Sequence, residues 1–369
     1  MLVRRGLFQK ASSYIVSLRQ GPCKLNRIFS AVPPSHENID KTKNIPQSEA
    51  ISAVEGVKKK KYSLYQDLMM LTKFELSMLN TTVALAGYML VPGAQFLSMN
   101  TLWFSLATQL MAMTSQTVNQ IKERGFDSKM LRTCMRPIPR NRVSVGTASA
   151  LAFTMWGLSN ALFYSLFPLN GLIVANSILF SYILFYTPMK RTSEHNTTVG
   201  SLVGALPPLL GWASAGGSIA ALEPWSIVLF MFAWQYPHFY GILWTYRADY
   251  DKQDYRMIND HKKASTIMKA SIGAMASSVC LLTYAGSFSY TGAALMFYYL
   301  GNGSYKSVID FEKDPSVQNA KQLKRKAYMP FTFFFVFIVL NIMGLTPEQI
   351  YDRLNESTPK EASSLPNSS

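Results

Sequence analysis

The sequence predicts an all-helical protein that crosses a membrane about nine times. Of its 369 residues, 49% are hydrophobic and only 15% are charged, whereas charged residues make up about 25% of an average soluble chain. The apolar residues fall into runs near the length of about 20 residues that spans a bilayer as a helix. Short basic loops follow every second run. Together these observations indicate a polytopic α-helical membrane protein.

The first 36 residues have the composition of a mitochondrial transit peptide. They contain six basic residues and several serines, and the first carboxylate of the chain is Glu37. Transit peptides are rich in arginine and serine and poor in acids. A disordered basic tail is the alternative interpretation. Residues 37–64 are polar and include the basic run Lys58–Lys61, so we expect a linker there.

The membrane domain is predicted at residues 65–345, followed by a polar C-terminal tail at 346–369. Its apolar segments have the length of membrane-spanning helices, except for the eighth, which is short. The nine segments are residues 73–91, 97–118, 143–166, 170–187, 199–217, 224–245, 266–286, 290–301 and 328–345.

The loops predict the topology of these segments. Lysines and arginines occur in each loop that follows an even-numbered segment. The loops after odd-numbered segments contain none; they are residues 92–96, 167–169, 218–223 and 287–289. The positive-inside rule places all the basic loops on one face, which in the mitochondrial inner membrane is the matrix face. The net charge of +15 could suggest nucleic acid as a partner. The basic residues of the loops stand beside apolar segments of membrane length, so nucleic acid is not expected.

The loop after the second segment carries a candidate metal site. Asn119, Glu123 and Asp127 stand four residues apart, and at about 100° per residue they share one stripe of a helix. Carboxylate and amide oxygens are ligands that Mg²⁺ accepts beside substrate phosphate. Arg132 and Arg136 follow and are suited to bind a diphosphate. The alternative is a solvated interfacial helix with pairs at four-residue spacing.

Two further basic loops are predicted on the same face. In the loop after the sixth segment we expect Asp249 to be a metal ligand. Position 253, four residues later, is glutamine, and Asp251 and Asp254 are expected to be solvated. The loop after the fourth segment contains Lys190 and Arg191, which suit diphosphate or simply obey the positive-inside rule.

Two features interrupt the predicted membrane helices. The run Gly204–Trp212 contains two prolines, and such a break is tolerated at membrane depth mainly where it lines a cavity. His238 follows Pro237 inside the sixth segment. A histidine there could ligate haem iron, bind a propionate or act as a base. The alternative is a histidine bonded to a neighbouring helix.

At these residues the chain resembles the UbiA superfamily of intramembrane prenyltransferases, and within it the haem-modifying branch. The resemblance covers about residues 65–345. It rests on N-x-x-x-E-x-x-x-D-x-x-M-x-R-T-x-x-R-P at 119–137, Y-T-P-x-K-R with G-A-x-P-P-x-x-G-W at 186–212, P-H-F at 237–239, and R-x-D-Y at 247–250. It implies a nine-helix UbiA-type bundle with its site at the matrix face.

The resemblance also implies an activity and a set of site residues. Farnesyl diphosphate would be joined to a vinyl group of haem b, giving haem O for haem A and cytochrome c oxidase assembly, with Mg²⁺ as cofactor and haem A synthase as a partner. The implied metal ligands are Asn119, Glu123, Asp127 and Asp249, with Tyr250 as a further catalytic residue. The implied substrate-binding residues are Lys73, Arg132, Arg136, Lys190, Arg191, Arg247 and His238.

Two other functions compete with this one. A quinone-prenylating member of the same superfamily is the nearer alternative, but the acid-poor second loop and P-H-F favour haem. A transporter of an anionic amphiphile is the alternative from another class. Transporters show repeat symmetry and charges at the membrane midplane, and an Asn/Glu/Asp stripe has no role in one.

Overall fold

The computed structural model describes residues 62–130, 133–251 and 255–350, and within them it contains helices and turns but no strand. The chain divides into two compact units. The smaller unit comprises the described parts of residues 1–77, 113–155 and 248–254. The larger unit comprises residues 78–112, 156–247 and the described part of 255–369. The predicted transit peptide, most of the predicted linker, Arg132 and most of the predicted C-terminal tail lie outside the described residues.

Within the described residues, the smaller unit begins with a short helix, α4 (Leu64–Thr72), which was not among the predicted elements. Its first turn is closed by a capping box: Ser63 Oγ accepts from the Gln66 amide, and Gln66 Oε1 accepts from the Ser63 amide. Such reciprocal bonds satisfy amides that a helix start leaves without partners. Leu71 packs in a buried cluster with Ile138, Val143 and Ala148. A helix therefore precedes the first predicted membrane segment.

Four helices contain residues of both units. They are α5 (Phe74–Met89), α6 (Met99–Asp127), α7 (Val145–Leu166) and α13 (Arg247–Asp251). The C-terminal half of α6 carries the predicted metal stripe and belongs to the smaller unit.

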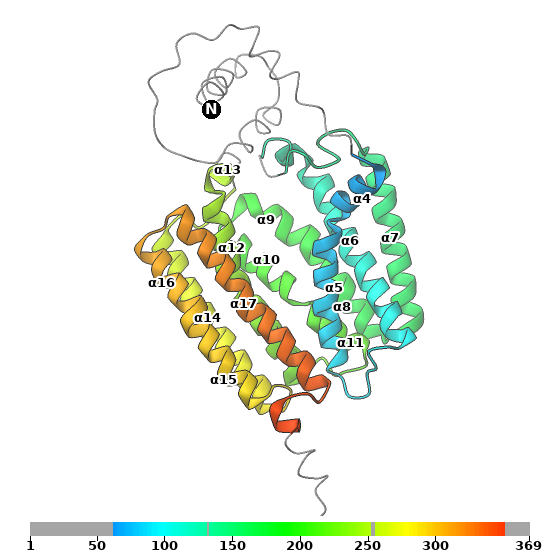
Figure 1. The fold of residues 1–369 in the computed structure, drawn as a ribbon. Helices are drawn as coiled ribbons and strands as arrows, with labels where there is room; N and C mark the ends of the chain where they lie inside the picture. Colours follow the sequence, from blue (N-terminus) through cyan, green and yellow to red (C-terminus); the bar gives the residue numbers. More distant parts are fainter. Residues whose placement is uncertain (1–61, 131–132, 252–254, 351–369) are drawn as a thin grey trace, which may run out of the picture. The chain divides into compact units, whose positions relative to one another are not determined.

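The larger unit is built around α12 (Leu222–Thr245), which packs along both α14 (His261–Tyr284) and α17 (Val317–Ile342) (Figure 1). Two of its elements, η1 and η2, are π-helical turns, which are wider than α-helical turns and often occur at functional sites. Besides its parts of the four shared helices, the larger unit contains α8 (Leu169–Phe180), η1 (Ser181–Tyr186), α9 (Thr187–Thr192), α10 (Asn196–Ala205), α11 (Pro207–Ser214), α12 (Leu222–Thr245), α14 (His261–Tyr284), α15 (Tyr290–Tyr299), η2 (Leu300–Tyr305), α16 (Lys306–Lys313) and α17 (Val317–Ile342).

Within the larger unit, α11 packs backbone to backbone against the end of α5. A Cβ atom at Gly211 would lie 1.8 Å from the carbonyl oxygen of Ala84, and one at Gly87 would lie 2.1 Å from that of Pro208. Because neither distance leaves room for a carbon atom, only glycine allows this approach. Close helix approach through small residues is typical of packing within membranes.

Each predicted membrane segment consists mainly of helical residues. The predicted break is confirmed, since α10 ends at Ala205 and α11 begins at Pro207. By length and apolar composition alone, three helical stretches of the described chain are able to cross a membrane. They are Leu169–Thr192, His261–Tyr284 and Val317–Ile350. The other segments are shorter, are interrupted, or carry polar residues, as α6 does with its stripe.

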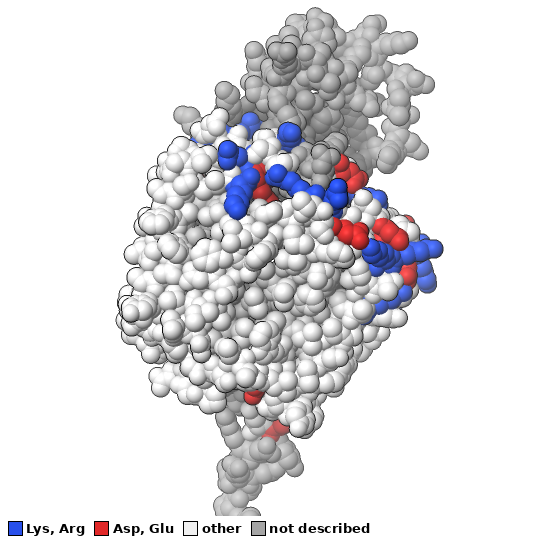
Figure 2. Space-filling view, turned by 180° about the vertical axis from the view of Figure 1, so that it is seen from behind, with Lys and Arg blue, Asp and Glu red and all other residues white. Residues whose placement is uncertain are grey.

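Large apolar side chains remain exposed along these helices, as a protein surrounded by lipid requires. Phe153 on α7 is 70% exposed and Tyr164 is 77% exposed. Figure 2 shows a wide area without Lys, Arg, Asp or Glu. At its right margin, charged side chains gather where Figure 1, seen from the opposite side, places α16 and the start of α17. This distribution fits the expected apolar belt with basic loops at its edge.

Candidate active site

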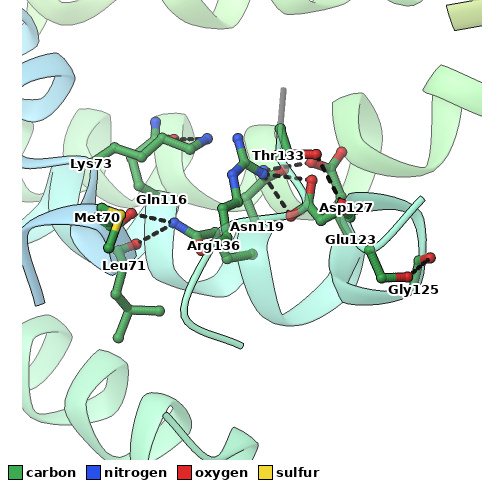
Figure 3. A network of polar contacts seen from close by, with 12 residues as sticks. Met70, Leu71, Lys73, Gln116, Asn119, Glu123, Gly125, Asp127, Thr133 and Arg136 are labelled. Atoms are coloured by element: carbon green, nitrogen blue, oxygen red, sulfur yellow. Dashed lines mark hydrogen bonds and ion pairs between the residues drawn. The ribbon is translucent and has the colours of Figure 1, made fainter. Parts of the chain in front are cut away.

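The predicted metal ligands Asn119, Glu123 and Asp127 line one stripe of α6 and are all buried, with 2%, 7% and 2% of their surfaces exposed. Asn119 Nδ2 donates to Glu123 Oε2 at 2.8 Å. Asn119 Oδ1 is buried, and no donor among the described residues reaches it. The four-residue spacing thus places three oxygen-bearing side chains next to one another, and one of their oxygens still lacks a partner (Figure 3).

Asp127, the last residue of α6, is held by Arg136. Arg136 Nη1 lies 2.6 Å from Asp127 Oδ2 and 2.7 Å from Oδ1. Burial raises the pKa of Asp127 above its usual range, and the charge and hydrogen bond of Arg136 oppose that rise. The sequence analysis assigned Arg136 to a diphosphate. In this structure its guanidinium contacts a predicted metal ligand.

The turn that follows α6 is held by backbone bonds that bring Arg136 back toward the helix. The Cys134 amide donates to Met130 O at 2.9 Å, and the Arg136 amide donates to Thr133 O at 3.0 Å. Thr133 Oγ1 also donates to Asp127 O at 3.2 Å. Pro137 comes directly after and cannot donate an amide to continue a helix. The motif R-T-x-x-R-P therefore folds into a compact turn beside the stripe.

Lys73 and two glutamines extend this polar region along α6. Lys73 Nζ donates to Gln116 Oε1 at 2.9 Å. Gln120 Nε2 donates to the carbonyl oxygens of Met70 and Leu71. Lys73 was predicted from the sequence as a substrate-binding residue, but neither glutamine was. Their spacing from Glu123 and Asp127 is the signal that could have found them, because positions 116, 120, 123 and 127 follow the helical repeat.

A second ion pair fixes the loop after α6 to α4. Arg142 Nε lies 2.8 Å from Asp67 Oδ1, and Asp67 is buried. Arg142 also donates to Met135 O at 2.8 Å and stands 4.3 Å from the Tyr62 ring centroid. This pair joins the beginning of the smaller unit to the loop that carries Arg136.

The predicted ligand Asp249 lies on α13. Residues 248–254 belong to the same unit as the stripe of α6. Tyr250 is buried, and residues 252–254, which include Gln253 and Asp254, lie outside the described residues. Arg247, in the larger unit, is exposed and stands 5.6 Å from the Trp244 ring centroid.

Lys190 and Arg191 lie at the end of α9 in the larger unit. Lys190 Nζ stands 4.5 Å from the centroid of the Tyr186 ring. The Arg256 amide donates to Lys190 O at 3.2 Å, and Asn196 Nδ2 donates to Ser193 O and Arg256 O. The segments predicted as basic loops after the fourth and sixth membrane segments are therefore bonded to each other, which agrees with the prediction that they share one membrane face.

His238 stacks between aromatic rings of the larger unit. Its ring centroid lies 4.8 Å from that of Trp234, nearly parallel, and 4.9 Å from that of Tyr328, edge to face. Trp234 Nε1 donates to Ala327 O at 2.6 Å, which fixes this stack to α17. His238 Nδ1 is buried and has no hydrogen-bond partner within the described chain.

The structure thus groups the candidate residues by unit. Lys73, the stripe of α6, Arg136 and the 248–254 segment belong to the smaller unit, and Lys190, Arg191, Arg247 and His238 belong to the larger one. Across the described residues no three His, Cys, Asp or Glu side chains cluster as a metal site. A site that relies on two carboxylates needs an amide or further oxygens, which Asn119 is placed to provide.

The geometry of this helical protein agrees with a comparison of its sequence. A model of the UbiA prenyltransferase family matches residues 80–338, which include the stripe of α6, both basic loops and His238. This chain belongs to the UbiA prenyltransferase family. The matched range begins after Lys73, so the break between α4 and α5 lies outside it.

Several relatives of this UbiA chain carry the same name. It is 31% identical over 288 residues to the protoheme IX farnesyltransferase of Christiangramia forsetii, covering 76% of this chain and 94% of that one. It is 38% identical to the protoheme IX farnesyltransferase of Opitutus terrae, over 53% of this chain and 65% of that one. It is 35% identical to the mitochondrial protoheme IX farnesyltransferase of Arabidopsis thaliana, over 63% and 53%. The chain thus spans less than two thirds of the latter two relatives.

Solved structures show the same UbiA fold at low sequence identity. A digeranylgeranylglyceryl phosphate synthase matches with a TM-score of 0.63 at 13% identity, covering 76% of this chain and 99% of that one. A UbiA homologue from Archaeoglobus fulgidus, bound to GPP and Mg²⁺, matches with a TM-score of 0.51 at 12% identity, covering 74% and 99%. These likenesses confirm the predicted all-helical UbiA-type bundle.

Proposed function

We propose that this chain transfers the farnesyl group of farnesyl diphosphate to a vinyl group of haem b. The observation that carries the proposal is the 31% identity to a protoheme IX farnesyltransferase over 94% of that relative's length. The buried stripe Asn119, Glu123 and Asp127 supports it, because a diphosphate-dependent enzyme needs ligands for a hard cation. The product would be haem O, which supplies haem A to cytochrome c oxidase assembly.

The residues of the stripe fit a magnesium ion. Asn119 Oδ1 is an unpartnered buried acceptor, and an amide oxygen is a suitable ligand. Glu123 and Asp127 lie in the last two turns of α6, where the negative end of the helix dipole disfavours carboxylates. A bound cation would offset both costs. We propose Asn119, Glu123 and Asp127 as ligands, with Asp249 from the second loop.

The solved homologue that holds GPP with Mg²⁺ supports a metal dependence in the family. When bound, Mg²⁺ would neutralise negative charge that develops on the diphosphate. Arg136 would keep Asp127 ionised and oriented. Among the described residues only its Nη1 bonds to Asp127, which leaves the rest of its guanidinium for an anion.

The cations of the chain would stabilise the departing pyrophosphate. The proposed cations belong to the segments that the sequence predicts as basic loops: Arg132, Arg136, Lys190, Arg191 and Arg247. As the bond between the farnesyl carbon and the diphosphate oxygen breaks, charge concentrates on the leaving group. Cations fixed in position stabilise that charge more than they stabilise the bound substrate, which lowers the barrier.

The allylic cation would then be attacked by the electron-rich vinyl group, forming a carbon–carbon bond. Apolar helices would exclude water from the first cation. Water would capture the second cation as a hydroxyl group, with its proton leaving to pyrophosphate. Aromatic side chains such as Tyr250 would stabilise positive charge through their ring faces.

The haem would be bound on the larger unit by His238. Its buried Nδ1 without a partner supports this assignment, since an imidazole nitrogen suits haem iron or a propionate. The stack between Trp234 and Tyr328 would hold the ring in one orientation. Haem A synthase, which would consume the product, is the proposed partner enzyme.

We place the enzyme in the mitochondrial inner membrane with its active site toward the matrix. The basic N-terminal segment, the mitochondrial relative from Arabidopsis thaliana and the basic even-numbered loops support this location. The lipid bilayer would cover the apolar helices and admit the farnesyl chain laterally.

The decisive experiment uses the purified full chain with farnesyl diphosphate, haem b and Mg²⁺, and identifies products by mass. We expect a farnesylated, hydroxylated haem. Parallel reactions replace haem b with a hydroxybenzoate, or farnesyl diphosphate with geranyl diphosphate. A prenylated aromatic acid as the main product would contradict the haem assignment. Addition of a chelator should stop turnover, and excess Mg²⁺ should restore it.

A further inference from the structure

The break between α4 and α5 places a lysine where a glycine is usual. Lys73 follows the last residue of α4 and adopts φ 43° and ψ 54°, in the left-handed region. Glycine is common at that position of a helix end because it has no Cβ to clash. A lysine there is conformationally unfavourable, so its side chain needs a compensating role.

The break is held by a complete set of hydrogen bonds. A helix leaves its last four carbonyl oxygens without intrahelical partners, and in α4 each of them accepts a bond. Met69 O accepts from the Lys73 amide. Met70 O and Leu71 O accept from Gln120 Nε2 at 2.6 and 2.9 Å, and Thr72 O accepts from Ser77 Oγ at 3.0 Å. Gln120, which is fully buried, alone satisfies two of the four.

A second glutamine holds the lysine side chain. Gln116 lies one turn before Gln120 on α6 and is 5% exposed. Its Oε1 accepts from Lys73 Nζ at 2.9 Å. The same helix carries Asn119, Glu123 and Asp127, and Figure 3 shows Gln116 and these three side chains along it. One helix therefore fixes the backbone of the break, the direction of the ammonium and the acidic stripe.

We infer that Gln116 and Gln120 are positioning residues that hold the ammonium of Lys73 for the diphosphate of an allylic substrate. This inference rests on the proposed function, since it names how one cation of that site is presented. Gln120 fixes the helix end that forces Lys73 into the left-handed region. Gln116 then orients the side chain along α6, toward the end that carries the metal ligands.

The test compares Gln116→Leu and Gln120→Leu with Gln109→Leu. Gln109 is a matched control because it is also a buried glutamine of α6, and its Oε1 accepts from Thr81 Oγ1 at 2.8 Å. All three variants lose a buried amide. Binding of inorganic pyrophosphate in the presence of Mg²⁺ is measured by calorimetry, together with kcat and KM for farnesyl diphosphate.

We expect Gln116→Leu and Gln120→Leu to weaken pyrophosphate binding about tenfold or more, as loss of a supporting partner does at metal sites. KM for farnesyl diphosphate should rise more than kcat falls, and haem binding should not change. Gln109→Leu should bind pyrophosphate as the wild type does. Equal binding by all three variants would overturn the inference. If Gln120→Leu fails to fold, Gln116→Leu decides, because it leaves the α4 carbonyl bonds intact.

Lys73→Gly provides a second measurement. It relieves the left-handed backbone, so thermal stability should not fall, whereas pyrophosphate binding should fall as much as in Gln116→Leu. The double variant Lys73→Gly with Gln116→Leu should lose no more pyrophosphate binding than either single variant, since both changes remove the same interaction. Additive losses would contradict the inference. A wild-type chain that binds pyrophosphate but does not farnesylate haem would overturn the proposed function and leave this inference standing.

Discussion

Arg142 Nε lies 2.8 Å from Asp67 Oδ1 and joins two residues that are 75 positions apart in the chain. The Asp67 side chain is 7% exposed and that of Arg142 is 22% exposed. Arg142→Leu should therefore lower the free energy of unfolding by about 3 kcal/mol, because it leaves a buried carboxylate without its charge partner. Thermal unfolding in detergent measures the effect.

Lys263→Ala is the control for this pair. Lys263 contacts Glu194 at 2.8 Å, but both side chains are nearly half exposed, so its loss should not change the melting temperature measurably. The double variant Asp67→Leu with Arg142→Leu should recover part of the lost stability. A double variant as unstable as Arg142→Leu alone would show that the effect comes from lost packing.

Glu123→Gln and Asp127→Asn should each reduce turnover at least about 100-fold. Even the loss of a residue that only supports a metal ligand lowers metal affinity or activity about 10- to 100-fold. Both changes keep the shape of the side chain, so membrane insertion and expression should remain normal. Asp310→Asn, on the exposed surface of α16, is the matched control. Near-normal turnover in either stripe variant would show that the carboxylate is not a ligand.

In the second acidic loop, Asp249→Asn should be severe, whereas Asp251→Asn and Asp254→Asn should be mild. The reason is that a single carboxylate of this loop is proposed to share the metal with the stripe of α6. Turnover at saturating Mg²⁺ and the Mg²⁺ concentration for half-maximal turnover separate the three variants. A larger loss of turnover in Asp251→Asn or Asp254→Asn than in Asp249→Asn would show that Asp249 is not the metal ligand of this loop.

His238→Ala should weaken haem binding more than farnesyl diphosphate binding. His238→Phe is the sharper variant, because it keeps a ring between Trp234 and Tyr328 while removing both nitrogens. Haem binding followed by its absorption band should fall in both variants, and diphosphate binding should persist. If His238→Ala weakens the binding of haem and of farnesyl diphosphate equally while His238→Phe weakens neither, His238 only packs against its neighbours.

The loops at 119–142 and 247–263 should face the matrix, and the tail after Thr346 should face the other side. In intact mitoplasts, an external protease should remove a tag placed at the C-terminus and leave tags in the two basic loops intact. Protection of the C-terminal tag until the inner membrane is opened would require an even number of spans.

The local parts of this site could be predicted from sequence. The spacing of Asn119, Glu123 and Asp127 fixes their common stripe, and Pro207 with Pro208 fixes the start of α11. The helix α4 had a local signal that was missed, because Ser63 and Gln66 form a capping box. Helix boundaries of this kind depend on only a few neighbouring residues.

Contacts between distant residues could not be predicted in this way. Gln120 donates to the carbonyl oxygen of Met70, 50 positions away in the sequence. The pattern of apolar residues does not indicate which buried glutamine will bond to the unpaired carbonyl oxygens at a helix end. The left-handed backbone of Lys73 follows from that tertiary contact rather than from lysine itself. Arg136 was assigned to a diphosphate, and its contact with Asp127 depends on the fold of the turn between them.

The contact of α11 with α5 has a consequence for inherited variation. Every missense change in the codons of Gly87 or Gly211 adds a Cβ atom where a carbonyl oxygen already stands. Such alleles should reduce the amount of protein in the cell, because α5 and α11 can no longer pack against each other. Alleles at Glu123 or Asp127 should leave the amount normal and the enzyme inactive. Protein abundance measured in heterozygous cells would therefore separate two routes to the same deficiency.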